Sequence, residues 1–321
     1  QAGKVLFNRQ VRRNKLRASV AQLEATTIAM EACSSAHYWG RVFEAMGHRV
    51  MLLPPQHVKP FVRVNKSDAH DALAVAEASL RPNLKVVPVK SVEQQDLQLL
   101  NRERQRWIQH RTALVNRIRA TAREYGVIMP QGIKGLRRAL PEVLEDADNE
   151  LSDVARRLLA ERADELRELD DKIERASAEQ QSLARHHTSY RALLAIPGYG
   201  PAVTAGFLGT VGDGRQFANG RQTSAWLGIV PRHTGTGGQT RMLGISKNGD
   251  RQLRTLLIHG ARAVVRHAHK RDDSLGRWVR QLEARRGRNR TVVALANKMA
   301  RIGWVVVAKG EPFDMNKAFA A

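Results

Sequence analysis

The chain has a single cysteine and no long hydrophobic run. One thiol cannot build a disulfide framework or a cysteine-rich zinc site, and it is typical of a reducing, intracellular compartment. The most apolar run, Ile302–Ala308, covers about two helical turns, whereas a membrane-spanning helix needs about 20 apolar residues. Residues 1–16 are basic and have no apolar stretch typical of a signal peptide. We therefore expect a cytoplasmic protein with no membrane partner.

Acidic residues are also scarce. The 321 residues include 53 Lys and Arg against 31 Asp and Glu, which gives a net charge of +22. A charge this large favours a polyanionic partner, with nucleic acid as the first candidate. Hydrophobic residues make up 42% of the chain, enough for a packed core, and the length favours more than one domain.

One stretch reverses the charge balance. Residues 142–179 hold 14 acidic residues and 6 Lys or Arg. Apolar residues repeat there every seven positions, which predicts a long helix with a coiled-coil seam. The two series are Leu159, Leu166, Ile173 and Leu169, Ala176, Leu183. Such a seam is expected either inside a helical bundle or between two subunits, and the pattern does not distinguish them.

A basic helix is predicted before the acidic one, over residues 97–125. Between residues 101 and 123 it carries seven arginines, Arg104 and Arg111 among them, and one acid. These arginines are expected either to lie along a nucleic-acid backbone or to pair with the acidic helix. The two helices would form an antiparallel arm, joined by a linker over residues 126–141 that is rich in Pro and Gly.

The sequence before the arm alternates between short strand and helix patterns, which favours an α/β domain. We expect strands over Lys4–Val11, Thr26–Glu31 and His48–Leu53, and helices over Arg12–Glu24, Ala36–Met46 and Asp68–Leu80. After the arm the pattern is mainly helical. The predicted fold class is therefore α/β plus mainly α, in three parts: residues 1–90, a helical arm over 91–188, and a mainly helical domain over 189–321.

Three acids in the first part are candidates for a metal site. Glu31 ends an apolar strand, and Asp68 and Asp71 lie three residues apart at the start of a helix capped by Ser67. Carboxylates that converge can hold a pair of Mg²⁺ ions about 4 Å apart for phosphoryl transfer. Acids in a first helical turn also stabilise the helix dipole, which is the simpler explanation for the two aspartates. Cys33, close to Glu31, is expected to be buried.

Two Gly-rich segments are candidates for contacts with nucleic acid. Residues 196–201, with Gly198 and Gly200, resemble a helix-hairpin-helix turn, in which free N–H groups bind a phosphate. Residues 231–241 combine hydroxyls, glycines, Arg232 and Arg241, which suits either a reactive loop or a flexible surface loop. Lys247 follows, and Asp250 is expected to cap the next helix.

The order of these motifs resembles the DEDD transposases of bacterial insertion sequences, the family numbered one-ten, which includes the Piv-type DNA invertases. The resemblance runs from about Lys4 to Asp314. The matching segments are residues 30–33, 36–40, 66–72, 196–201, 228–232, 244–250 and 256–262.

The resemblance implies a RuvC-like, ribonuclease-H-like N-terminal domain, a coiled-coil arm used in assembly, and a C-terminal transposase domain. Family members bind Mg²⁺ through four acids, of which the last three correspond to Glu31, Asp68 and Asp71. They are expected to form a covalent link to DNA through a serine, to use a structured guide RNA, and to act as a homo-oligomer, a dimer or tetramer.

The chain departs from this family pattern at two places. The first family aspartate, on the opening strand, is expected before Lys4, so the first strand and one ligand are expected to be missing. Where a serine is expected, the chain has Thr234 and Thr236, and Thr236 next to Gly237 corresponds best. The leading hypothesis is thus a Mg²⁺-dependent transposase with Thr236 as nucleophile. The alternatives are a RuvC-like junction-resolving nuclease and an inactive remnant that only binds nucleic acid.

Overall fold

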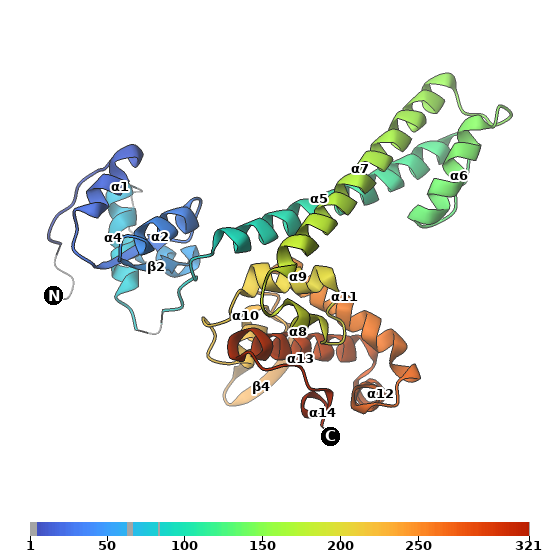
Figure 1. Cartoon of the computed structure of the whole chain (residues 1–321). Helices are drawn as coiled ribbons and strands as arrows, with labels where there is room; N and C mark the ends of the chain where they lie inside the picture. The colour runs from blue at the N-terminus through green and yellow to red at the C-terminus, as the bar shows by residue number, and fades with distance from the viewer. Residues whose placement is uncertain (1–4, 63–66, 83, 321) are drawn as a thin grey trace. The chain divides into compact units, whose positions relative to one another are not determined.

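The structure is a computed structural model that describes residues 5–62, 67–82 and 84–320. It divides into two compact units, Gln1–Val92 and Glu93–Ala321, each with its own core. The architecture is mixed α/β, dominated by helices, with two small two-stranded sheets. Figure 1 shows the elements of both units.

The first unit is built around a parallel pair of strands. Its elements are α1 (Arg13–Ala21), β1 (Thr27–Glu31), α2 (Ala36–Glu44), β2 (Arg49–Leu53), α3 (Pro55–Val58), η1 (Lys59–Phe61) and α4 (Asp68–Ser79). The register pairs Thr27 with Arg49 and Glu31 with Leu53, so the carboxyl ends of both strands lie together. Helix α4 packs on this pair through Ala74 and Ala78, which are fully buried. The predicted strands and helices from Arg12 onward are confirmed within a few residues at each end.

The strand predicted over Lys4–Val11 is wrong for residues 5–11, which have no regular structure, and Lys4 lies outside the described residues. Val5, Leu6 and Phe7 are all exposed. A short apolar run forms a strand only when a neighbouring strand pairs with its backbone and a core covers one face. In the part of the chain that the structure describes, neither is provided for this segment.

The second unit begins with a helical arm. Its helices are α5 (Val92–Glu124), α6 (Ile133–Glu145) and α7 (Asp153–Arg185). Arg104 Nε donates to Ser177 Oγ over 2.7 Å and Arg162 Nη1 donates to Thr121 Oγ1 over 2.7 Å, so α5 and α7 run antiparallel, as Figure 1 also shows. Leu159 and Leu166 of the predicted seam are buried against α5 and α6. The apolar seam is therefore covered within one chain.

The segment expected as a linker, residues 126–141, is partly wrong: α6 begins at Ile133 and contains Pro141. Ile133, Leu136 and Leu140 lie on one face of this helix and pack in the arm's core. Burying that face outweighs the helix-breaking tendency of the proline, a signal that is purely local.

The remainder of the second unit is a helical core with a hairpin. Its elements are α8 (Tyr190–Leu194), α9 (Pro201–Val211), α10 (Gly220–Trp226), β3 (Pro231–Thr236), β4 (Gln239–Ile245), α11 (Arg251–His267), η2 (Ala268–Lys270), α12 (Ser274–Arg286), α13 (Arg288–Lys309) and α14 (Met315–Ala318). Helix α13 contacts α10, α11 and α12. Among the described residues it is also the one helix long and apolar enough to cross a membrane, but half of its most apolar window is buried inside the unit. It serves here as the central core helix.

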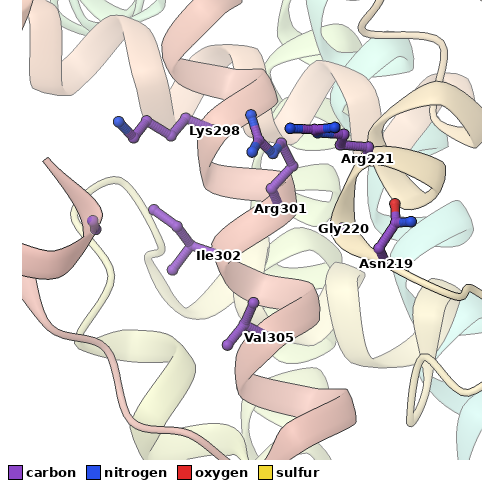
Figure 2. A pocket seen from close by; sticks show the side chains of 8 residues that line it. Asn219, Gly220, Arg221, Lys298, Arg301, Ile302 and Val305 are labelled. Carbon is purple, nitrogen blue, oxygen red and sulfur yellow. The ribbon is translucent and has the colours of Figure 1, made fainter.

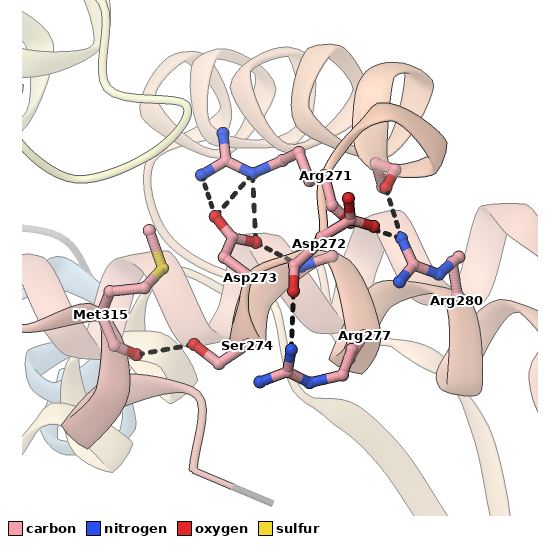
Figure 3. A network of polar contacts seen from close by, with 9 residues as sticks. Arg271, Asp272, Asp273, Ser274, Arg277, Arg280 and Met315 are labelled. Carbon is pink, nitrogen blue, oxygen red and sulfur yellow. Dashed lines mark hydrogen bonds and ion pairs between the residues drawn. The ribbon is translucent and has the colours of Figure 1, made fainter.

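A polar network fixes the turn from α11 into α12 (Figure 3). Asp273 caps α12 by accepting from the Gly276 N–H over 2.8 Å, and it also pairs with Arg271. Arg280 donates to the carbonyl of Ala268 over 2.9 Å. Ser274 Oγ donates to the Met315 carbonyl over 3.4 Å, which ties α14 to the same turn.

Candidate functional site

Glu31 ends β1 beside Leu53 of β2, where the chain leaves the sheet. The N–H of the next residue, Ala32, donates to the Leu53 carbonyl over 2.7 Å, which holds this end of the strand in place. Glu31 is half-buried. Such an edge, outside the carboxyl ends of parallel strands, is where α/β folds place binding sites. Cys33, expected to be buried, is exposed, because it lies in the turn after the strand.

Asp68 and Asp71 lie in the first turn of α4. Ser67 caps this helix, as predicted, and its Oγ accepts from the His70 N–H over 3.3 Å. Asp68 is exposed and Asp71 is half-buried. Because α4 contacts β1, the two aspartates and Glu31 belong to one packed substructure. Lys66, which precedes this cap, lies outside the described residues.

The chemistry of these three carboxylates suits a hard divalent cation, which prefers oxygen ligands. Their arrangement does not close around one: over residues 5–62, 67–82 and 84–320, no three His, Cys, Asp or Glu side chains lie close enough together to hold a metal ion. Within the described residues, the structure therefore does not assemble a complete metal centre from these three carboxylates.

Residues 231–245 form a β-hairpin, so this segment has regular structure where both alternatives from the composition placed a loop. Gly237 and Gly238 form its two-residue turn with φ values of 59° and 80°, a conformation that glycine adopts without strain. Thr236 pairs with Gln239 and Thr234 pairs with Arg241. Since side chains alternate along a strand, Thr234, Thr236 and Arg241 lie on one face of the hairpin. All three are exposed.

The base of the hairpin is held by contacts that the sequence did not reveal. Lys247 is exposed with φ of 59°, and its N–H donates to the Gly228 carbonyl over 3.1 Å. The buried Arg254 donates from Nη1 to the carbonyls of Leu227 and Asn248, over 2.9 and 2.7 Å. Because both bonds go to backbone carbonyls, Arg254 holds the backbone on either side of the hairpin in place, including the segment that carries Lys247. Arg232 lies next to the strand irregularity at this base and is exposed.

The turn over residues 196–201 connects α8 to α9, as predicted, and lies against α11. Gly198 has φ of 90°, and a Cβ added there would lie 3.0 Å from the Gly260 carbonyl oxygen. Tyr199 is buried and its hydroxyl donates to the Met299 carbonyl over 3.2 Å. Gly200 is exposed and caps α9, with no atom within 4 Å of an added Cβ. Close packing against α11 therefore explains why residue 198 is a glycine. Gly200, in contrast, leaves the start of α9 open to solvent.

The two arginines singled out on α5 are engaged within the arm. Arg104 donates to Ser177, and Arg111 donates to Asp170 over 2.8 Å, where Arg137 of α6 also pairs. Burial and the neighbouring Arg111 lower the pKa of Arg104 below its ordinary value. In the structure, Arg104 and Arg111 thus bind partners on the acidic helix α7, which is one of the two alternatives expected from the sequence. Arg102, Arg106, Arg117 and Arg123 on the same helix are exposed.

Comparison with known proteins assigns the family. A family model described as "Transposase IS116/IS110/IS902 family" matches residues 190–275, and a model for DEDD transposases of the IS110 group, described as "Transposase", matches residues 1–127. A probable family 20 transposase of Pseudomonas aeruginosa is 45% identical over 306 residues, which cover 95% of this chain and 90% of that protein. The chain belongs to the IS110 family of DEDD transposases.

Two further relatives also match this transposase over nearly its whole length. The transposase for insertion sequence element IS1111A of Coxiella burnetii is 41% identical, over 97% of this chain and 85% of its own length. The transposase for IS1328 of Yersinia enterocolitica is 36% identical, over 97% and 92%. The transposase is thus an enzyme that cleaves and recombines DNA, and the alternative of a junction-resolving nuclease is not favoured. Its family also implies a divalent metal ion.

Proposed function

We propose that this transposase cuts and rejoins the DNA of its own insertion sequence in the cytoplasm, at the nucleoid. The first unit would be the RuvC-like catalytic domain over residues 1–90, followed by an arm over 91–188 and a transposase domain over 189–321. The observation that supports the proposal is the packing of α4 on β1, since the elements that carry Glu31, Asp68 and Asp71 are thereby in contact with each other.

Glu31, Asp68 and Asp71 would hold the metal, which we propose to be Mg²⁺. When bound, Mg²⁺ would stabilise negative charge on the phosphoryl oxygens. Asp68 and Asp71 lie in the first turn of α4, where the helix dipole stabilises an acidic side chain by only about 0.3–1 kcal/mol, so removing one charge should leave the helix folded. We therefore expect Asp68→Asn to abolish strand exchange while α4 stays folded.

Thr236 would be the nucleophile. Its Oγ1 would attack the phosphorus of a DNA phosphodiester, forming a threonine–phosphate ester. The hydroxyl proton would pass to water, and the displaced sugar oxygen would take up a proton. Arg241 lies on the same face of the hairpin, where a guanidinium can bind the phosphate oxygens. The exposure of this face supports the proposal, because a DNA strand can reach it.

The partners we propose are double-stranded DNA, a structured guide RNA and further copies of the chain. Arg232, Lys247 and the exposed start of α9 at Gly200 would bind further phosphates of the nucleic acid. Gly198 would shape this turn, and Arg104 and Arg111 would orient the arm through their partners on α7. Because the seam of α7 is already buried, assembly into dimers or tetramers would use the outer surface of the arm.

The covalent step is tested by trapping a protein–DNA adduct. The transposase is incubated with end-labelled DNA of its element, Mg²⁺ and any RNA that co-purifies with it, and then denatured. We expect Thr236→Ala to remove the adduct and Thr236→Ser to retain it. Thr234→Ala is the matched control on the same hairpin face and should retain it too. An adduct formed by Thr236→Ala, or cleavage with free ends and no adduct in the parent protein, would exclude Thr236 as the nucleophile.

A further inference from the structure

A cavity of about 490 Å³ lies in the second unit between α10, α13 and α14. Figure 2 labels the residues that α13 and the start of α10 contribute to its lining. A volume of this size falls within the range of about 300–1,000 Å³ found for small-molecule sites. Single phosphates need far less room, so the cavity can take a larger group.

The polar wall of the cavity is cationic. Arg221 comes from α10, and Lys298 and Arg301 come from α13, and in Figure 2 the two guanidinium groups lie next to each other. The lining contains no carboxylate, and among the described residues none of the three cations forms an ion pair within 4.0 Å. Lys298 and Arg301 are three residues apart on one helix, where like charges repel. An anion in the cavity would relieve this repulsion.

The position of Lys298 is set by two aromatic rings. Its Nζ lies 5.0 Å from the centre of the Trp278 ring and 4.7 Å from that of Phe319, within the range of cation–π attraction. Burial and the neighbouring Arg301 lower the pKa of Lys298 below its ordinary value. The two rings thus hold the Lys298 ammonium group at the cavity, although burial and Arg301 disfavour its charge.

The lining also has an apolar part, formed by Ile302, Val305 and Ala318. On α13 the residues at 298, 301, 302 and 305 follow the spacing of a single helix face, so this one helix supplies both cations and apolar groups to the cavity. Gly220 lets α10 approach α13 closely, because a Cβ there would lie 2.9 Å from the Arg301 carbonyl oxygen. The two helices are therefore held in fixed contact at the cavity.

We propose that this cavity binds one unstacked nucleotide of single-stranded nucleic acid, with its phosphate on Arg221 and Arg301 and its sugar or base against Ile302, Val305 and Ala318. The inference rests on the proposed action of the chain on DNA and RNA. A duplex keeps its bases stacked inside, so only its phosphates could reach a concave site. An unpaired nucleotide can also insert its base, which stacks on apolar, aromatic or guanidinium groups.

The first test fills the cavity without changing charge. Binding of labelled single strands of about 12 nucleotides, one DNA and one RNA, is compared with that of a duplex by fluorescence anisotropy. We expect Val305→Trp to weaken single-strand binding roughly tenfold and to change duplex binding by less than about twofold. Val154→Trp is the matched control, since Val154 is an exposed valine of α7, 58% accessible. Thermal melting confirms that each variant is folded.

The second test removes charge and keeps the proposal falsifiable if Val305→Trp does not fold. Arg301→Gln should weaken single-strand binding roughly tenfold, and more than Arg138→Gln, which removes the same charge from an exposed position on α6. The strand that loses more affinity, DNA or RNA, identifies the source of the nucleotide. Equal effects of Arg301→Gln and Arg138→Gln, or unchanged single-strand binding by folded Val305→Trp with duplex binding intact, would overturn the inference alone. A parent protein that binds neither strands nor duplex would overturn the proposed function as well.

Discussion

Replacing Gly198 by alanine should destabilise the second unit far more than the same change at Gly200, two residues away. At Gly198 the backbone has φ of 90°, and an added Cβ would lie 2.7 Å from Met299 Cε and 3.0 Å from the Gly260 carbonyl oxygen. The methionine methyl can move aside, but the carbonyl belongs to α11 and cannot. The turn would have to shift away from the helix that it packs against.

The size of the effect follows from two costs. A left-handed backbone conformation costs an alanine about 1–2 kcal/mol, and overpacking a tight contact costs about 1–3 kcal/mol. We expect Gly198→Ala to lower the free energy of unfolding by about 3 kcal/mol. Gly200 has φ of −81° and no atom within 4 Å of an added Cβ, so Gly200→Ala should change it by less than about 1 kcal/mol.

The assay is urea unfolding of both variants, followed by circular dichroism. Gly260→Ala approaches the same contact from the other side, since its Cβ would meet the Gly198 carbonyl oxygen. The double variant should therefore lose less stability than the sum of the two single variants. Equal, small losses for Gly198→Ala and Gly200→Ala would refute the packing explanation of Gly198.

Two further predictions concern the cap of α12 and the core of the arm. The hydrogen bond from Arg271 and that from the Gly276 N–H hold the pKa of Asp273 below its ordinary value of 3.8, so its contribution to stability is present above that pH and is lost as the pH falls through the lowered pKa. Asp273→Ala should lower the free energy of unfolding by about 1 kcal/mol at neutral pH. Urea titrations should find that this difference between parent and variant becomes smaller in acid. A difference that stays constant with pH would exclude the carboxylate as its cause. Leu166→Ala should cost about 2–5 kcal/mol because Leu166 is buried in the arm, whereas exposed Val154→Ala should stay within about 0.5 kcal/mol in the same denaturation assay. Similar losses for both would contradict a packed arm core.

Local patterns were sufficient for most helices and strands. Ser67 and Asp250 were expected to cap helices, and both accept a hydrogen bond from a backbone N–H in the first turn. A cap depends only on residues within one turn, so the sequence contains all of its determinants. The same holds for the heptad positions Leu159 and Leu166, which are buried as their spacing predicts.

Which surface covers an apolar seam depends on residues far away in the chain. Any complementary apolar helix face can bury the heptad positions of α7, so a second subunit would cover the seam as well as α5 does. Arg111 was expected either to lie along a nucleic-acid backbone or to pair with the acidic helix. It pairs with Asp170, which lies 59 residues away in the chain. Neither the heptad pattern nor the excess of arginines contains that information.

The sequence by itself determined the family, the charge and the residue types of the candidate site, since these are carried by short motifs and composition. Only the tertiary structure decided which of those residues meet. The hairpin register puts Thr236 and Arg241 on one face, and α10 and α13 bring Arg221 beside Arg301 from 80 positions away. Long-range juxtaposition arises from packing and backbone pairing over the whole fold, and those interactions leave no local signal in the chain.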